Sequence, residues 1–151
     1  YLSLLRMADV QGTNPVGASQ ASEPSQTDND ELSCGMEAGP EKVVIFVPSD
    51  SLGRGSPELG ERLMVAFFHT LLDISARPSR IIFMNSGVRL VATGSKALED
   101  LKALESNGVD IISCGTCLGF YELTDKLEVG KISNMFDIAT VLMEARRIVQ
   151  L

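Results

Sequence analysis

The chain has 151 residues, which is enough for one domain with its own hydrophobic core. Its formal net charge of −7 is concentrated in residues 1–41, and neither that acidic part nor the nearly neutral remainder offers the basic surface that nucleic-acid binding needs. No apolar run is long enough to cross a membrane, and 3 cysteines do not suggest a disulfide scaffold, so we expect a cytoplasmic protein.

Residues 11–41 are rich in Ser, Gly, Pro, Gln and Asp and contain almost no large apolar side chains. Such a segment cannot bury enough surface to offset its chain entropy, so we predict a disordered acidic linker. Residues 1–10 (YLSLLRMADV) precede it. They are expected to be either the remnant of a preceding domain or a frayed terminus.

From residue 42 onward, apolar strand patterns alternate with helical patterns. KVVIFV at 42–47 is a continuous β-branched run, typical of a parallel strand that is buried on both faces. Ser56 and Pro57 are typical of the N-cap and first turn of a helix, which we expect over 58–75. Further strands are expected at 80–85, 109–113, 131–133 and 146–151, and further helices at 95–108 and 135–145.

The ends and faces of the later elements can also be predicted. Asn107 and Gly108 are typical of a helix end, and Asn134 is suited to cap the helix that follows it. The segment 86–94 (SGVRLVATG) is expected to be a loop, and a short helix is expected after the two cysteines at 114 and 117. The inner face of the helix at 135–145 is predicted to comprise Met135, Ile138, Ala139, Leu142 and Met143.

Strands and helices that alternate at this spacing indicate βαβ units and a parallel sheet that is covered on both faces. We therefore expect a three-layer α/β/α domain over residues 42–151, with a mainly parallel sheet of about five strands. Right-handed crossovers place every strand-to-helix loop at one edge of such a sheet, where ligands bind. The loops expected at that edge are 48–56 (PSDSLGRGS), 85–90 (NSGVRL) and 113–119 (SCGTCLG).

The two cysteines of SCGTCLG are the first candidates for chemistry. Cys114 directly follows a predicted strand and Cys117 begins the next helix, where free N–H groups and the helix dipole stabilise a thiolate. A thiolate attacks a sulfane sulfur or a disulfide and binds metals. Reactive thiols, metal ligands, buried core cysteines and a structural disulfide all remain open. A zinc site is disfavoured because only Cys34 and His69 would remain as further ligands, and we expect no cofactor.

Residues of the three loops are candidates for binding the substrate of such a thiol. Arg54 would supply positive charge near Cys114, and Asn85 would donate a hydrogen bond to a bound sulfur species. Gly115 and Thr116, next to Cys114, are further candidates, whereas Asp50 and Ser49 are weaker ones. SDSLGRGS is not a Walker A loop, because it lacks the Gly-Lys-Ser/Thr ending.

His69 is not expected to act as a base for these thiols. It lies in the helix predicted over 58–75, about 18 Å along the axis from the edge that carries the cysteines. The lack of a nearby histidine disfavours hydrolytic chemistry.

Four segments within residues 42–151 resemble a known family. They are, in chain order, VVIFVPSDSLGRGSPELGERLMVAFFHTL, FMNSGVRL, GVDIISCGTCL and KLEVGKISNM. They resemble the C-terminal domain of the YedF-type sulfurtransferase-like selenium metabolism proteins. That domain belongs to the DsrE/DsrF-like sulfur-relay family.

The resemblance implies a domain that passes sulfur between protein thiols. It implies that Cys114, at the end of a central strand, carries the persulfide, and that Cys117 is an additional cysteine. It further implies donor and acceptor proteins as partners, assembly into a homo-oligomer, and a preceding TusA-like domain, of which 1–10 would be the final part. The link to selenium follows from the family's name alone.

Three functions therefore remain in view. In the first, Cys114 attacks a donor persulfide and holds the sulfur, which an acceptor thiolate takes or Cys117 releases by forming a disulfide. In the second, the domain is a thiol–disulfide oxidoreductase in which Cys114 and Cys117 cycle as a pair. In the third, it is a non-catalytic binding or assembly module that presents its glycine loops to a partner.

Overall fold

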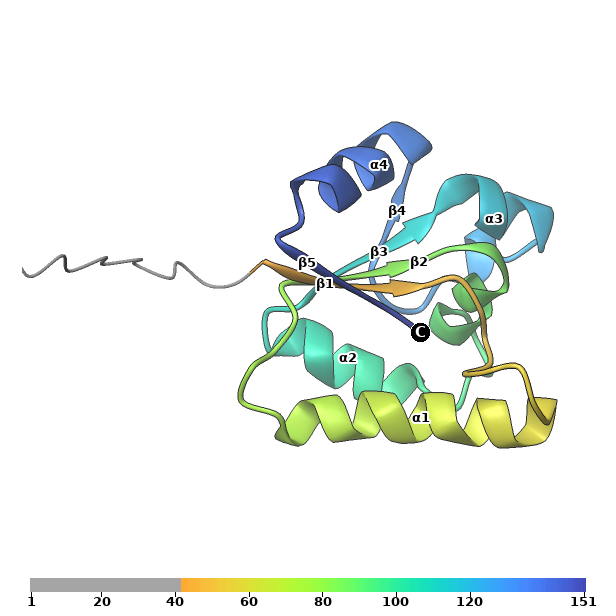
Figure 1. Ribbon diagram of the computed structural model, residues 1–151. Helices are drawn as coiled ribbons and strands as arrows, with labels where there is room; N and C mark the ends of the chain where they lie inside the picture. Colours follow the sequence, from red (N-terminus) through yellow and green to blue (C-terminus); the bar gives the residue numbers. More distant parts are fainter. Residues whose placement is uncertain (1–41) are drawn as a thin grey trace, which may run out of the picture. The chain divides into compact units, whose positions relative to one another are not determined.

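Five parallel strands form the centre of the computed structural model, which describes residues 42–151 (Figure 1). The strands lie in the order β4-β3-β2-β1-β5, and every neighbouring pair is parallel. Their bounds are Val43–Val47 (β1), Arg80–Phe83 (β2), Asp110–Cys114 (β3), Lys131–Ser133 (β4) and Arg147–Gln150 (β5). The linker and domain remnant predicted for residues 1–41 lie outside the described residues, as does Cys34.

Helices cover both faces of this sheet. One face carries α1 (Pro57–Asp73) and α2 (Leu98–Ser106), and the other carries α4 (Met135–Glu144) (Figure 1). The short elements η1 (Asn85–Val91), α3 (Gly115–Phe120) and η2 (Thr124–Lys126) complete the described chain. The prediction of a three-layer α/β/α fold is confirmed. No helix within residues 42–151 combines the length and the apolar composition that a membrane span requires.

Each strand face has its own core. In β3, Ile111 packs into the cluster beneath α1 and α2, whereas Ile112 and Cys114 pack into the cluster beneath α4. This alternation follows from the two-residue period of a strand, and burial on both faces explains the continuous apolar runs seen in the sequence. The sheet thereby fixes the backbone on which Cys114 stands.

The predicted helix caps are confirmed. The Ser56 hydroxyl accepts a hydrogen bond from the Leu59 N–H at 3.5 Å, and Asn134 accepts one from the Asp137 N–H at 2.9 Å. Gly108 follows α2 with a φ of 90°, a conformation that glycine adopts without strain.

The prediction of a loop over residues 86–94 is wrong for most of that segment. Residues Asn85–Val91 form the 3-10 helix η1, and Val88, Leu90 and Val91 are buried. The apolar residues pull this segment into the core beneath α1 and α2. Gly87 permits the approach, because a side chain at this position would clash with the carbonyl oxygen of Val47.

The predicted inner face of α4 is only partly right. Ile138 is buried and Leu142 is half-buried, but Met135, Ala139 and Met143 are exposed. The face that meets the sheet is instead Ile138, Val141, Leu142 and Ala145. Because α4 packs on the sheet without a neighbouring helix in the described chain, its contact stripe is narrow and leaves apolar side chains in solvent.

One buried polar group in β3 has no partner. The Ser113 side chain is 0% exposed, and its hydroxyl makes no hydrogen bond within residues 42–151. Since an unsatisfied buried hydroxyl keeps its desolvation cost, Ser113→Ala should raise the free energy of unfolding by about 1 kcal/mol. Urea denaturation measures this, with the exposed Ser106→Ala as control. A loss of stability in Ser113→Ala would show that the hydroxyl has a partner.

Candidate thiol site

The two cysteines lie where β3 ends and α3 begins. Cys114 is the last residue of β3, and Cys117 is the third residue of α3. The adjacent strand β2 ends at Phe83, so η1 begins beside the same edge of the sheet. The Asn85 N–H donates a hydrogen bond to the Cys117 sulfur at 3.1 Å. The predicted convergence of these two loops is confirmed.

The cysteines differ in their access to solvent. Cys114 is 1% exposed and belongs to the core beneath α4, whereas Cys117 is partly exposed and packs against both cores. Neither forms a disulfide. Burial raises the pKa of the Cys117 thiol, and the hydrogen bond and charge of Cys114 raise it further, whereas the Asn85 N–H lowers it.

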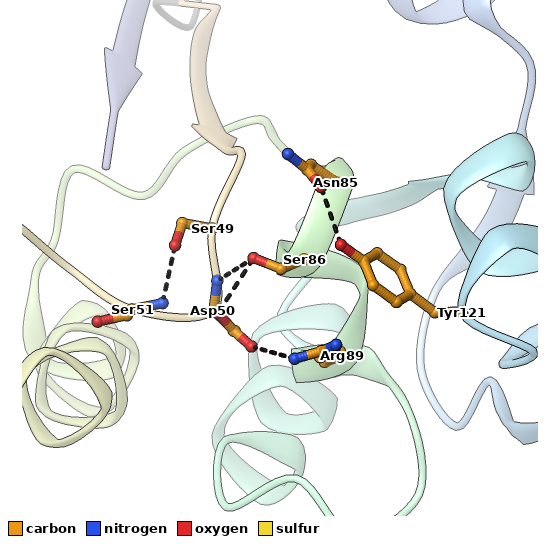
Figure 2. Close-up of polar contacts among 7 residues, drawn as sticks. All are labelled: Ser49, Asp50, Ser51, Asn85, Ser86, Arg89 and Tyr121. Atoms are coloured by element: carbon orange, nitrogen blue, oxygen red, sulfur yellow. Dashed lines mark hydrogen bonds and ion pairs between the residues drawn. The ribbon is translucent and has the colours of Figure 1, made fainter. Parts of the chain in front are cut away.

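Asn85 is held in an unusual conformation. Its φ of 47° lies in the left-handed region, which asparagine tolerates better than most residues. The Tyr121 hydroxyl donates a hydrogen bond to the Asn85 side-chain oxygen at 3.0 Å, as Figure 2 shows. Both the backbone and the side chain of Asn85 are therefore engaged, and its N–H is kept in place against the sulfur.

A polar network connects Tyr121 with Arg89, Asp50 and Ser86 (Figure 2). The Arg89 guanidinium lies 4.6 Å from the centroid of the Tyr121 ring and 3.3 Å from the Asp50 carboxylate. The Ser86 hydroxyl donates to Asp50 at 3.0 Å and accepts from the Asp50 N–H at 3.2 Å. The loop after β1 is thereby joined to η1 and α3.

Sequence reasoning missed Tyr121, Arg89 and Ser86, and treated Asp50 as a weak candidate. Ser86 and Arg89 contact Asp50, and Tyr121 contacts Asn85, in each case across more than 30 positions of the chain. No local sequence pattern therefore indicates these contacts. Arg89 lies within the loop 85–90, which was expected at this edge of the sheet. Its position in that loop was the one sequence feature from which a cation near the cysteines could have been predicted.

The other predicted site residues are placed differently. Arg54 is exposed and makes no hydrogen bond or ion pair within the described residues, so the cation joined to this network is Arg89. Thr116 is exposed on α3. A side chain at Gly115 would come within 2.9 Å of the Ile132 side chain, so glycine is needed here for close packing against β4. Substrate binding by these three residues stays a prediction.

Apolar side chains are exposed on the elements that flank the cysteines. Phe120 ends α3, and Ile132 lies in β4 beside Gly115. Met135 and Phe136 begin α4. We call these four residues the apolar rim; their exposed fractions are 80% (Phe120), 49% (Ile132), 54% (Met135) and 80% (Phe136). Exposed apolar side chains around a site are typical of a surface that meets another protein.

Two other features bear on the chemistry. Within residues 42–151 no group of three or more His, Cys, Asp or Glu side chains is arranged to hold a metal ion. His69 lies on α1 and pairs with Asp100 of α2 at 3.1 Å, so it is engaged between these two helices.

Comparison with known proteins identifies the fold. No family model and no curated protein matches the chain. The crystal structure of the ychN protein from E. coli is similar with a TM-score of 0.51 and 19% identity, covering 73% of this chain and 99% of that one. The structure of the protein of unknown function MTH1491 from Methanobacterium thermoautotrophicum is similar with a TM-score of 0.52 and 20% identity. The match covers 72% of this chain and 97% of that one.

Both of these proteins belong to the DsrE/DsrF-like fold family, and residues 42–151 share that fold. At this level of identity the likeness extends to the fold alone. The placement of the chain among the YedF-type proteins stays a prediction.

The pKa of the Cys117 thiol should respond to its two neighbours in opposite directions. Cys114→Ala removes a cause that raises the pKa, so the pKa should fall. Tyr121→Phe releases the Asn85 side chain and loosens the N–H that lowers the pKa, so the pKa should rise. The pH dependence of alkylation at Cys117, followed by mass spectrometry, measures both changes. Equal shifts in one direction would contradict this description of the site.

Proposed function

We propose that residues 42–151 form a sulfur-relay domain that accepts sulfane sulfur on its cysteine pair. The observation that carries the proposal is the Asn85 N–H at 3.1 Å from the Cys117 sulfur. A backbone donor aimed at a partly exposed thiol stabilises the negative charge of a thiolate or of a persulfide anion. The DsrE/DsrF-like fold supports the same function.

Burial determines the order in which the two thiols act. A donor molecule meets Cys117 first, because Cys114 is 1% exposed. The Cys117 thiolate attacks the outer sulfur of a donor R–S–SH, the sulfur–sulfur bond of the donor breaks, and RS⁻ leaves. The product is the persulfide Cys117–S–SH. Sequence analysis assigned the persulfide to Cys114, whereas we propose that Cys117 receives the sulfur first.

Two routes remove the sulfur. An acceptor thiolate attacks the outer sulfur of Cys117–S–SH, takes it, and leaves the Cys117 thiolate behind. Alternatively, the Cys114 thiolate attacks the inner sulfur, which gives a Cys114–Cys117 disulfide and releases HS⁻. The second route requires an external thiol to reduce the disulfide before the next cycle.

A second function, thiol–disulfide exchange, is supported by one specific contact. Cys114 lies close enough to Cys117 to raise the pKa of its thiol, so the two residues are near enough to act as a pair. Selenium handling, a TusA-like domain in the same chain, assembly into an oligomer and a cytoplasmic location stay predictions.

Mass spectrometry of the intact chain separates the two functions. The experiment uses a Cys34→Ser background, so that Cys114 and Cys117 are the remaining cysteines. After incubation with a sulfane donor, a gain of about 32 Da is expected in this background and with Cys114→Ser, but not with Cys117→Ser. A loss of about 2 Da that needs both cysteines, together with no gain of about 32 Da in Cys114→Ser, would instead indicate the oxidoreductase.

The apolar rim is proposed to dock the protein that donates sulfur. Phe136→Ser should slow loading from a cysteine desulfurase in its persulfide form by about tenfold, because central aromatic residues dominate interface energies. Loading from inorganic polysulfide should not change, since a small donor needs no docking surface.

The matched control for this experiment is Met143→Ser. Met143 is 86% exposed on the same helix but lies near its C-terminal end. Equal slowing in both variants, or slowing with polysulfide as well, would contradict a docking role for the rim.

A further inference from the structure

A cavity of about 620 Å³ lies next to the thiol site. Its walls come from α1, from the loop after β1, from η1 and the segment between η1 and α2, and from the residues that follow α3. Val65, Leu90 and Leu123 form an apolar part of the lining. The volume is within the range of pockets that hold small organic molecules.

The charges around this cavity are of both signs. Arg62 pairs with Glu58 at 2.6 Å and Arg89 pairs with Asp50 at 3.3 Å. Glu61 and Lys96 also line the cavity, and neither makes an ion pair within residues 42–151. One carboxylate and one ammonium group are thus available to a ligand, above apolar surface.

The charged groups at the cavity balance. The cations are Arg62, Arg89 and Lys96, and the acids are Asp50, Glu61 and Glu58, which is the partner of Arg62. A complementary ligand carries an ammonium group, a carboxylate and some apolar surface between them. Short peptides and peptide-like compounds have this pattern.

We propose that the cavity binds a small peptide-like zwitterion, of about the size of a tripeptide such as glutathione. Its ammonium group meets Glu61, and a carboxylate meets Lys96. The further assignment to a thiol peptide rests on the proposed sulfur relay, whereas the size and charge argument does not.

Tyr121 joins this cavity to the thiol site. Tyr121 lines the cavity, and its hydroxyl donates to the Asn85 side chain (Figure 2). The Asn85 N–H in turn donates to the Cys117 sulfur. A ligand that contacts Tyr121 therefore acts on the hydrogen bond to Asn85. Occupancy of the cavity should change the reactivity of Cys117.

Binding is tested with S-methylglutathione, which has no free thiol and so cannot exchange or carry sulfur. Titration of the ¹⁵N-labelled full chain should give saturable shifts at the Thr93, Gly94 and Ser95 amides, which border the cavity. Lys96→Ala and Glu61→Ala should each weaken binding by about tenfold, as expected for the loss of one charge-assisted contact.

Lys102→Ala is the control for these variants, because Lys102 pairs with Glu128 outside the cavity and should bind the probe like the wild type. No saturable shift at the three amides up to about 10 mM probe would overturn the proposal. Equal weakening by Lys102→Ala would overturn the assigned site. Neither result depends on sulfur transfer, so this proposal and the sulfur relay can fail separately.

The coupling is tested by the alkylation rate of Cys117 with and without the probe. In the wild type we expect saturating S-methylglutathione to change the rate by about fivefold. Tyr121→Phe keeps the ring but loses the hydroxyl, so binding should persist while the rate no longer responds. An unchanged rate in the wild type, or the same response in Tyr121→Phe, would overturn the coupling through Tyr121.

Discussion

The contact between the Asn85 N–H and the Cys117 sulfur is the interaction on which the proposed chemistry of this domain depends. It exists because β2 and β3 are neighbouring parallel strands, so that the segments following them meet at one edge. Gly87 lets η1 pack against the end of β1, and the left-handed backbone of Asn85 sets the position of its N–H. Tyr121 then holds the Asn85 side chain, which leaves the donor little freedom to turn away.

Opposing influences set the reactivity of Cys117. Burial and the neighbouring Cys114 raise the pKa of its thiol, and the Asn85 N–H lowers it without cancelling them. The raised pKa makes this thiol slower to ionise than a free cysteine, so we propose that contact with a donor triggers its reaction.

Much of the fold could be predicted from local patterns. The buried run before Pro48, the Ser56 and Asn134 caps and the glycine after α2 are local signals, and the three-layer fold follows from their order. Asn85 could be predicted because right-handed crossovers place its loop and the cysteines at the same edge of the sheet. Tyr121 could not be found, because its contact with Asn85 spans 36 residues and depends on how α3 ends. The exposure of Met135 and Met143 was missed because the apolar pattern does not reveal how little of α4 the sheet covers.

The central claim is that Cys117 receives the sulfur and Cys114 does not. The most direct test loads the wild-type chain with less than one equivalent of a sulfane donor and then blocks all thiols. Fragmentation of the peptide that contains both cysteines locates the extra sulfur. The account predicts that the sulfur is found on Cys117, beside the Asn85 N–H. Sulfur found on Cys114, despite its 1% exposure, would contradict the account.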